Sequence, residues 1–162
     1  MQDEESIEAA EEHSEEITRP SPPEVWLLKL VLTHPTSVAW LVEHLDPTWI
    51  QNSVVKDIFE RRLLAEAQGL WRSVGLFLDQ FESQQVRSLI TEATMDDREI
   101  PNPEQQLADL TLRLRNQFID GQLSALTLRI SQPEASDADR VEWLRQQQQL
   151  KQLKRQPLSP LC

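Results

Sequence analysis

The side chains best suited to chemistry in this chain are three histidines, one pair of adjacent acids and a single cysteine. His34 and His44 stand at the predicted ends of helices, where contact with a backbone carbonyl or with the helix dipole accounts for a histidine. His13 lies in a stretch dominated by glutamate. Metal binding would require further Cys, His or carboxylate ligands at matching spacings, and the sequence offers none. We therefore predict no metal site.

Nucleophilic and phosphate-binding chemistry also lack their usual residues. Cys162 stands among Pro, Ser and Leu at the chain end, with no nearby base to activate its thiol. The three glycines are too few to build a phosphate-cradling loop. Asp96 and Asp97 have the oxygen ligands that Mg²⁺ prefers, but adjacent acids in a connecting loop are usually solvated or cap a helix. The sequence favours a protein that is not an enzyme, and we expect no cofactor.

Charge is unevenly distributed along the chain, whose net charge is -11. Residues 1–24 hold nine acids and one base, whereas residues 140–156 hold five bases and one acid. Because affinity for nucleic acid comes mainly from cations at phosphates, we expect no strong direct binding to nucleic acid.

No apolar run reaches the roughly 20 residues of a membrane span, and the acidic start does not resemble a signal peptide. We predict a cytoplasmic protein without a membrane partner.

Composition predicts an all-α fold. Leu, Gln, Glu and Arg are abundant and Tyr is absent, so helix formers outnumber the aromatic and β-branched residues typical of sheets. Ser21, Pro22 and Glu24 form a helix start with a capping box, and Pro35 ends the apolar run that follows. Four further short helices follow from apolar stripes at helical spacing. These stripes are Val38, Leu41, Val42 and Leu45; Val55, Ile58, Phe59 and Leu63; Val74, Phe77, Leu78 and Phe81; and Val86, Leu89, Ile90 and Ala93.

Ser53 is expected to cap the helix that carries Val55, Ile58, Phe59 and Leu63, and Gly69 to end it. The polar residues 95–101 then lead into two longer helices. Asn102 is expected to cap the first, residues 103–130, and Ser136 the second, residues 137–155.

The first long helix carries two apolar stripes on different sides. Leu107, Leu110, Leu114 and Phe118 form one, and Ile119, Leu123, Leu126 and Ile130 form the other. A helix that changes its buried face along its length is expected to change its packing partner. The breaker at residues 131–136 predicts that the second long helix folds back antiparallel on the first.

These patterns predict a compact helical bundle followed by a protruding antiparallel helical hairpin. We divide the chain into an acidic disordered linker or tail (1–21), the bundle subdomain (22–120), the hairpin subdomain (121–156) and a flexible tail (157–162). The acidic stretch buries too little apolar surface to offset the entropy lost on ordering.

Trp143 is the most informative aromatic residue. Trp26, Trp40, Trp49 and Trp71 lie in the predicted bundle, where core packing accounts for them. Trp143 instead lies on a helix made mostly of Arg, Gln, Lys and Glu. Two interpretations stay open: it packs across the hairpin, or it anchors a partner protein. The candidate partner-binding residues on this helix are Arg140, Val141, Trp143, Leu144, Gln147, Leu150, Lys151, Leu153 and Lys154.

The apolar run Val25 to Leu32 and its Thr33-His34-Pro35 ending resemble the first helix of the C-terminal helicase-binding domain of bacterial DNA primase. The leucine-rich helix at 107–130, followed by the capped helix from Ser136, resembles the closing helices of that domain. The resemblance covers roughly residues 23–156 and implies a non-catalytic interaction module. Its implied partner is the N-terminal collar of the hexameric replicative helicase, with the hairpin attaching primase and the bundle modulating helicase and priming activity.

Two alternatives remain. The N-terminal domain of a replicative helicase is similar in fold, but the short tail after the last helix favours primase. A self-associating helical adaptor, dimerising through its hairpin, is the second. The catalytic parts of a primase are absent from the sequence, so the primase interpretation predicts a C-terminal piece whose acidic stretch is a linker.

Overall fold

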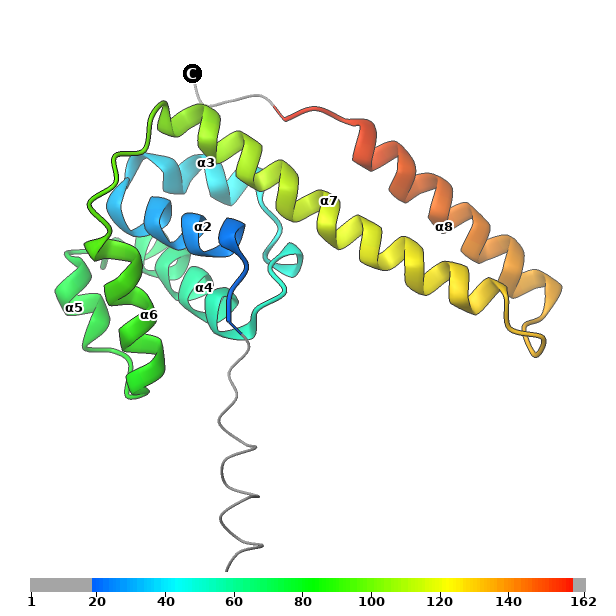
Figure 1. Cartoon of the computed structure of the whole chain (residues 1–162), viewed down its shortest axis with the longest axis horizontal. Helices are drawn as coiled ribbons and strands as arrows, with labels where there is room; N and C mark the ends of the chain where they lie inside the picture. The colour runs from blue at the N-terminus through cyan, green and yellow to red at the C-terminus, as the bar shows by residue number, and fades with distance from the viewer. Residues whose placement is uncertain (1–18, 159–162) are drawn as a thin grey trace, which may run out of the picture.

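The computed structural model describes residues 19–158, in which every regular element is helical (Figure 1). The prediction of an all-α chain is confirmed for this range. Residues 1–18 and 159–162, which include most of the predicted linker and part of the predicted tail, lie outside the described residues. In chain order the elements are α2 (Pro22–Thr33), α3 (Thr36–His44), the 3₁₀ turn η1 (Pro47–Trp49), α4 (Ser53–Ala67), α5 (Val74–Leu78), α6 (Gln84–Met95), α7 (Pro103–Ile130) and α8 (Asp137–Arg155).

The α2 helix lies at the centre of the packed core, because its sequence is apolar on nearly every side. Leu27, Leu28 and Val31 have no exposed surface. The helix packs against α4, α6 and α7, and also contacts α3 (Figure 1). In the stretch that the structure describes, no helix is long and apolar enough to cross a membrane.

Glu24 joins the start of α2 to the start of α4. Its carboxylate, only 4 % exposed, accepts hydrogen bonds from the Ser21 backbone N–H at 3.0 Å and the Ser21 hydroxyl at 2.8 Å, completing the predicted capping box. The other carboxylate oxygen accepts from the backbone N–H of Asn52 at 2.8 Å. One carboxylate therefore satisfies donors at two helix N-termini, where negative charge is also favoured by the helix dipole.

Two predictions about single residues are wrong: the cap of α4 and one core residue of α3. Asn52, not Ser53, is the cap: its side-chain oxygen accepts from the N–H groups of Val54 at 3.0 Å and Val55 at 3.1 Å. Gly69 follows the helix end with φ +67°, a conformation that suits glycine, as predicted. On α3, Val42 was expected in the core but is 58 % exposed.

Arg62 is a fully buried cation in the bundle. Its Nε donates to the Val31 carbonyl at 3.2 Å and its Nη1 to Glu66 at 2.8 Å. The guanidinium carbon lies 3.6 Å from the centroid of the Trp71 ring, a cation–π contact. Nη2 has no hydrogen-bond partner, so the guanidinium is held by Glu66, the Val31 carbonyl and the Trp71 ring.

The α7 helix buries different faces along its length. Leu107, Leu110 and Leu114 belong to the bundle core. Ile119 and Leu126 are buried but lie outside that core cluster, because α8 covers this half of the helix. The bounds of α7 and α8 are those predicted from the sequence. Asn102 does precede Pro103, but its backbone is left-handed, with φ 50°, and its side chain makes no capping hydrogen bond.

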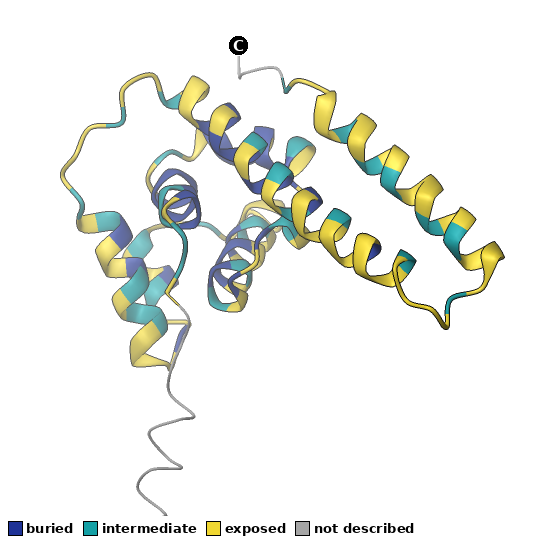
Figure 2. Ribbon diagram, turned by 45° about the vertical axis from the view of Figure 1, so that its right-hand side comes forward, coloured by how far each residue is buried: buried dark blue, intermediate teal, exposed yellow. Residues whose placement is uncertain are grey.

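The α8 helix runs antiparallel to α7, and the two extend beyond the other helices (Figure 1). Ser136 caps α8 as predicted, accepting from the Asp139 backbone N–H at 3.1 Å. None of the α8 residues is buried, and its ribbon in Figure 2 is teal and yellow throughout. The α8 helix thus rests on one neighbour and leaves most of its circumference to solvent.

We predict that Glu24→Gln destabilises the fold by about 1–3 kcal/mol, because a neutral amide weakens three hydrogen bonds at a buried site. Urea unfolding followed by circular dichroism measures the change. Glu60→Gln, an exposed position on α4, is the matched control and should change stability by less than about 0.5 kcal/mol. Equal effects of the two substitutions would contradict a joining role for Glu24.

Candidate functional site

The α8 helix carries two heptad stripes that are offset by one residue. The inner stripe, made of half-buried side chains, consists of Arg140, Trp143, Gln147 and Leu150. The outer stripe, made of exposed side chains, consists of Val141, Leu144, Gln148, Lys151 and Arg155. Because one heptad stripe is enough to pack against one helix, α7 occupies the inner stripe and leaves the outer stripe free.

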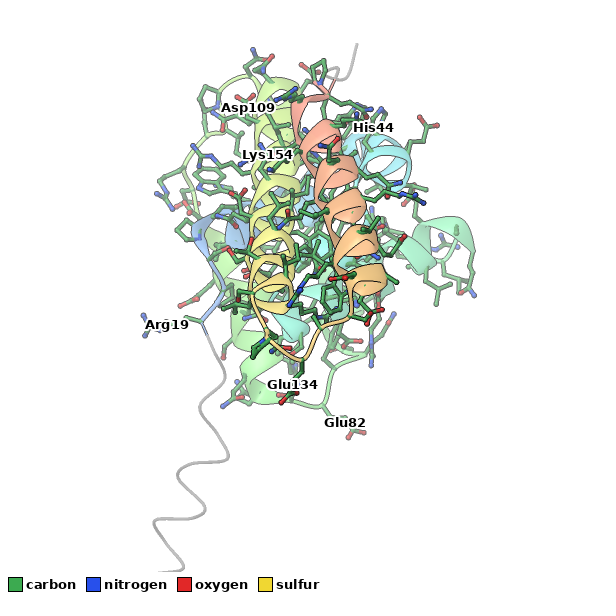
Figure 3. The ribbon with its side chains drawn as sticks, turned by 90° about the vertical axis from the view of Figure 1, so that its right-hand side faces the viewer. Arg19, His44, Glu82, Asp109, Glu134 and Lys154 are labelled. Carbon is green, nitrogen blue, oxygen red and sulfur yellow. The ribbon has the colours of Figure 1, made fainter. Side chains whose placement is uncertain are left out.

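Polar contacts fix the inner stripe in register with α7 (Figure 3, where Glu134 marks the turn between the helices). Gln147 donates to the Thr127 hydroxyl at 3.0 Å. Lys154 Nζ lies 2.6 Å from Asp120 Oδ1. Arg140 donates to the Gln132 carbonyl at 3.0 Å. Lys154 and Arg140 are therefore engaged within the α7–α8 pair.

Arg115 holds the C-terminal end of α8 against α7. Its side chain is 2 % exposed, and its Nη2 donates to the carbonyls of Lys154 at 3.2 Å and Gln156 at 2.6 Å. Carbonyls at a helix end lack intrahelical donors and carry the negative end of the dipole, so a cation satisfies both. Burial lowers the pKa of Arg115, because desolvation disfavours the charged form.

The nine predicted partner-binding residues are distributed over both sides of α8. Trp143, Leu150 and Leu153 are half-buried, as are Arg140 and Gln147. Val141, Leu144 and the two lysines are exposed. The structure therefore does not bring the nine together on one face; it divides them between the α7 contact and solvent.

The outer side of α8 combines apolar groups with cations. Val141 is 60 % exposed and Leu144 is 50 % exposed. Leu144 lies beside a shallow hollow of about 420 Å³ that it lines with Arg145, Gln148, Gln149 and Gln152. Among the described residues, Lys151 and Arg155 have no acidic partner, and Arg145 lies 3.8 Å from Glu142. We call the set Val141, Leu144, Arg145, Gln148, Lys151, Gln152 and Arg155 the outer face of α8.

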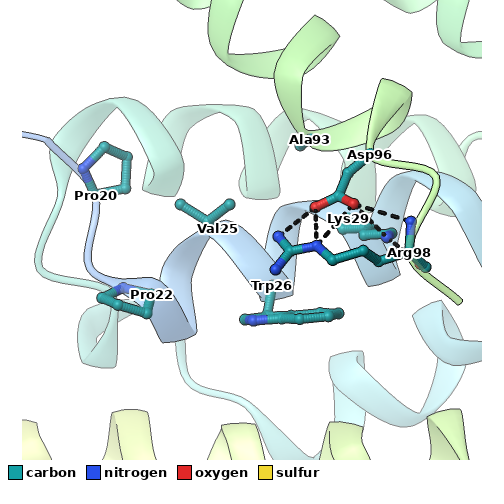
Figure 4. Close-up of a pocket in the computed structure, with 8 residues that line it drawn as sticks. All are labelled: Pro20, Pro22, Val25, Trp26, Lys29, Ala93, Asp96 and Arg98. Carbon is teal, nitrogen blue, oxygen red and sulfur yellow. Dashed lines mark hydrogen bonds and ion pairs between the residues drawn. The ribbon is translucent and has the colours of Figure 1, made fainter. Parts of the chain in front are cut away.

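A second candidate site is a pocket of about 290 Å³ at the start of α2 (Figure 4). Pro20, Pro22 and Val25 line one side, and the Arg98 side chain lies between the Asp96 carboxyl and the Trp26 ring. The guanidinium carbon of Arg98 lies 5.4 Å from the centroid of that ring.

Ion pairs hold the charged side of this pocket. Arg98 Nη2 lies 2.5 Å from Asp96 Oδ2, and Lys29 Nζ lies 3.6 Å from Asp96 Oδ1. Hydrogen bonds from the Arg98 side chain and backbone, with the charges of Arg98 and Lys29, hold the pKa of Asp96 far below its ordinary value. Asp96 is therefore ionised at neutral pH and has no proton to donate, so it positions the Arg98 and Lys29 side chains and does not act as an acid.

The two described histidines have structural contacts, whereas His13 lies outside the described residues. His44 stacks on Trp40 with ring centroids 4.3 Å apart, and its Nδ1 lies 2.9 Å from the Trp40 carbonyl. His34 follows the last residue of α2. In residues 19–158, no three metal-ligating side chains form a group that could hold an ion.

Sequence reasoning missed Arg115 and the Trp26 pocket. Arg115 directly follows Leu114 of the core-facing stripe, so the sequence indicates only a charged residue beside that stripe. The pocket joins residues from α2 with Asp96 and Arg98, about 70 positions along the chain, and no local spacing indicates that contact. A search of protein-family models, characterised proteins and solved structures gives no match to this chain.

We predict that Arg115→Met loosens the C-terminal turn of α8. The variant removes two hydrogen bonds to helix-end carbonyls but retains an apolar stem, so amide hydrogen exchange at residues 150–156 should accelerate by about tenfold. Arg113→Met, an exposed position one residue before Leu114, is the control and should leave exchange unchanged. Unchanged exchange in Arg115→Met would contradict a role of Arg115 in holding the end of α8.

We predict that Asp96 stays ionised as the pH is lowered through the range in which an ordinary aspartate becomes protonated. Because its pKa is depressed in the folded state, its contribution to stability is present above the ordinary aspartate pKa and is lost only as the pH falls through the lower folded-state value. Carboxyl carbon NMR shifts during an acid titration report the midpoint. Arg98→Gln should raise that midpoint, whereas Arg87→Gln should not.

Proposed function

We propose that this chain is the C-terminal helicase-binding domain of a bacterial DNA primase, a non-catalytic module that attaches primase to the replicative helicase. The observation that carries the proposal is the outer face of α8, an exposed heptad stripe on a helix held in place by a single neighbour. The order of the helices and the α2 sequence resemble that domain, as described above. A cytoplasmic location follows from this partner.

The composition of the outer face supports protein docking. Val141 and Leu144 offer apolar surface on adjacent turns, and each is at least half exposed. Lys151 and Arg155 carry charge with no acidic partner among the described residues. An apolar centre flanked by cations fits a partner helix that carries apolar residues flanked by acids, because charge at the rim accelerates association and selects the partner.

The packing of α7 supports a division of labour between the proposed bundle (22–120) and hairpin (121–156) subdomains. The N-terminal half of α7 is fixed in the bundle core through Leu107, Leu110 and Leu114. Its C-terminal half carries α8 away from the bundle (Figure 2). A partner that binds α8 thereby contacts a helix that is already ordered, which limits the entropy lost on binding. The proposed role of the bundle is modulation of helicase and priming activity.

We predict that Leu144→Glu weakens binding to the replicative helicase of the same organism by tenfold or more, because it removes apolar surface and reverses the local charge. Fluorescence anisotropy or calorimetry on the purified pair measures the change. Leu64→Glu, an equally exposed leucine on α4, is the matched control and should bind as the unchanged chain does.

Failure of the unchanged chain to bind the helicase at low micromolar concentration would contradict the primase proposal. The alternative of a self-associating adaptor predicts a concentration-dependent dimer by sedimentation, lost on Leu144→Glu. The alternative of a helicase N-terminal domain predicts binding to a primase and not to the helicase. These three outcomes are mutually distinguishable.

A further inference from the structure

The outer face of α8 and the N-terminal residues of this chain are opposite in charge. Among the cations of α8, Lys154 and Arg140 are engaged within the α7–α8 pair, and Arg145 is exposed beside Glu142. Lys151 and Arg155 are exposed and have no acidic partner among the described residues. Residues 1–18 contain eight acids and no lysine or arginine. The acidic residues 1–18 and the cations of the outer face are therefore complementary in charge.

We propose that residues 1–18 bind the outer face of α8 within the same molecule. This proposal rests on the proposed function only for its consequence: the acidic segment covers the docking face until a partner displaces it. The contact itself requires no partner protein.

The composition of the segment fits this face. Its eight acids are spread from Asp3 to Glu16, and Ile7 and Ile17 are its large aliphatic residues. The acids can pair with the cations of α8, and an isoleucine can contact Val141 or Leu144.

The length of the segment is sufficient. An extended chain of 18 residues reaches about 60 Å, whereas the 19 residues of α8 span about 28 Å. The segment is attached to Arg19, at the left edge of the bundle in Figure 3. Covalent attachment within one chain gives a local concentration of about a millimolar, so even a weak contact is substantially occupied.

A second copy of the chain fits the outer face less well. Pairing two α8 helices in parallel through their outer faces would bring Arg145, Lys151 and Arg155 of one molecule against the same three cations of the other. Like charges in a partly desolvated interface oppose association. The acidic segment neutralises these cations instead.

Paramagnetic relaxation in the full chain tests the contact. Cys162→Ser removes the native thiol, and Ser6→Cys carries a nitroxide label. We expect amide peaks of the outer face, among them those of Arg145, Gln148 and Gln152, to lose intensity at low ionic strength. The loss should decrease in 0.5 M NaCl, where the Debye length is below about 5 Å. Peaks of α3 should keep their intensity.

Charge variants provide the matched comparison. Lys151→Glu with Arg155→Glu should restore the α8 peaks, whereas Arg113→Glu with Arg129→Glu, two exposed cations of α7, should not. The same spectra show whether each variant is folded. Full intensity of the α8 peaks in the labelled chain, or a loss that charge reversal on α8 leaves unchanged, would overturn the proposal.

A mixture of labelled unenriched chain with unlabelled ¹⁵N chain separates contact within one molecule from contact between copies. We expect no loss of intensity in the mixture, and a loss equal to that in the labelled ¹⁵N chain would overturn the proposal. Because no helicase is present, this experiment can fail while helicase binding persists. Equally, helicase binding can fail while the segment is found on α8.

Discussion

The change of buried face along α7 is the constraint on which the rest of the structure depends. Leu107, Leu110 and Leu114 pack into the core around α2, whereas Ile119 and Leu126 are buried by α8. A helix with one continuous stripe would lie along the bundle for its whole length, and α8 would then have to join the core. Because the second stripe of α7 faces α8 and not the bundle, α8 lies outside the core and none of its residues is fully buried.

Polar contacts add to apolar burial in holding α8 against α7. Trp143, Leu150 and Leu153 are the half-buried large apolar residues of α8. Gln147, Lys154 and Arg115 add directional contacts at three levels, to Thr127, to Asp120 and at the helix end. Hydrogen bonds to charged groups are stronger than neutral ones, and they fix one alignment of the two helices. Lys154 is paired with Asp120 in these contacts, whereas the cations of the outer face remain exposed to solvent.

Helix bounds could be predicted from the sequence, because they depend on local apolar spacing. The face by which each helix packs could not, because it depends on the helix that lies against it. The bounds of α7 and α8 follow from apolar spacing and breakers, and both were predicted. The two stripes of α8 are each heptads with two large apolar residues, Trp143 and Leu150 or Val141 and Leu144. Spacing alone therefore could not tell which stripe α7 would cover. Asn52 and Ser53 are adjacent and both are good cap residues, so the sequence could not distinguish which of them caps α4. The role of Arg115 could not be predicted from local spacing, because its carbonyl partners lie about 40 residues away.

The composition of the outer face also determines what kind of contact it can make. Two exposed aliphatic side chains provide too little apolar surface for a permanent interface, which needs a larger desolvated centre. Three cations on the same side add attraction that acts at a distance but is weakened by salt. Such a face favours fast, reversible binding to acidic helices over a stable assembly. On the two proposals made above, a partner helix and residues 1–18 compete for α8, and the attached segment competes at a local concentration that its attachment to the same chain determines.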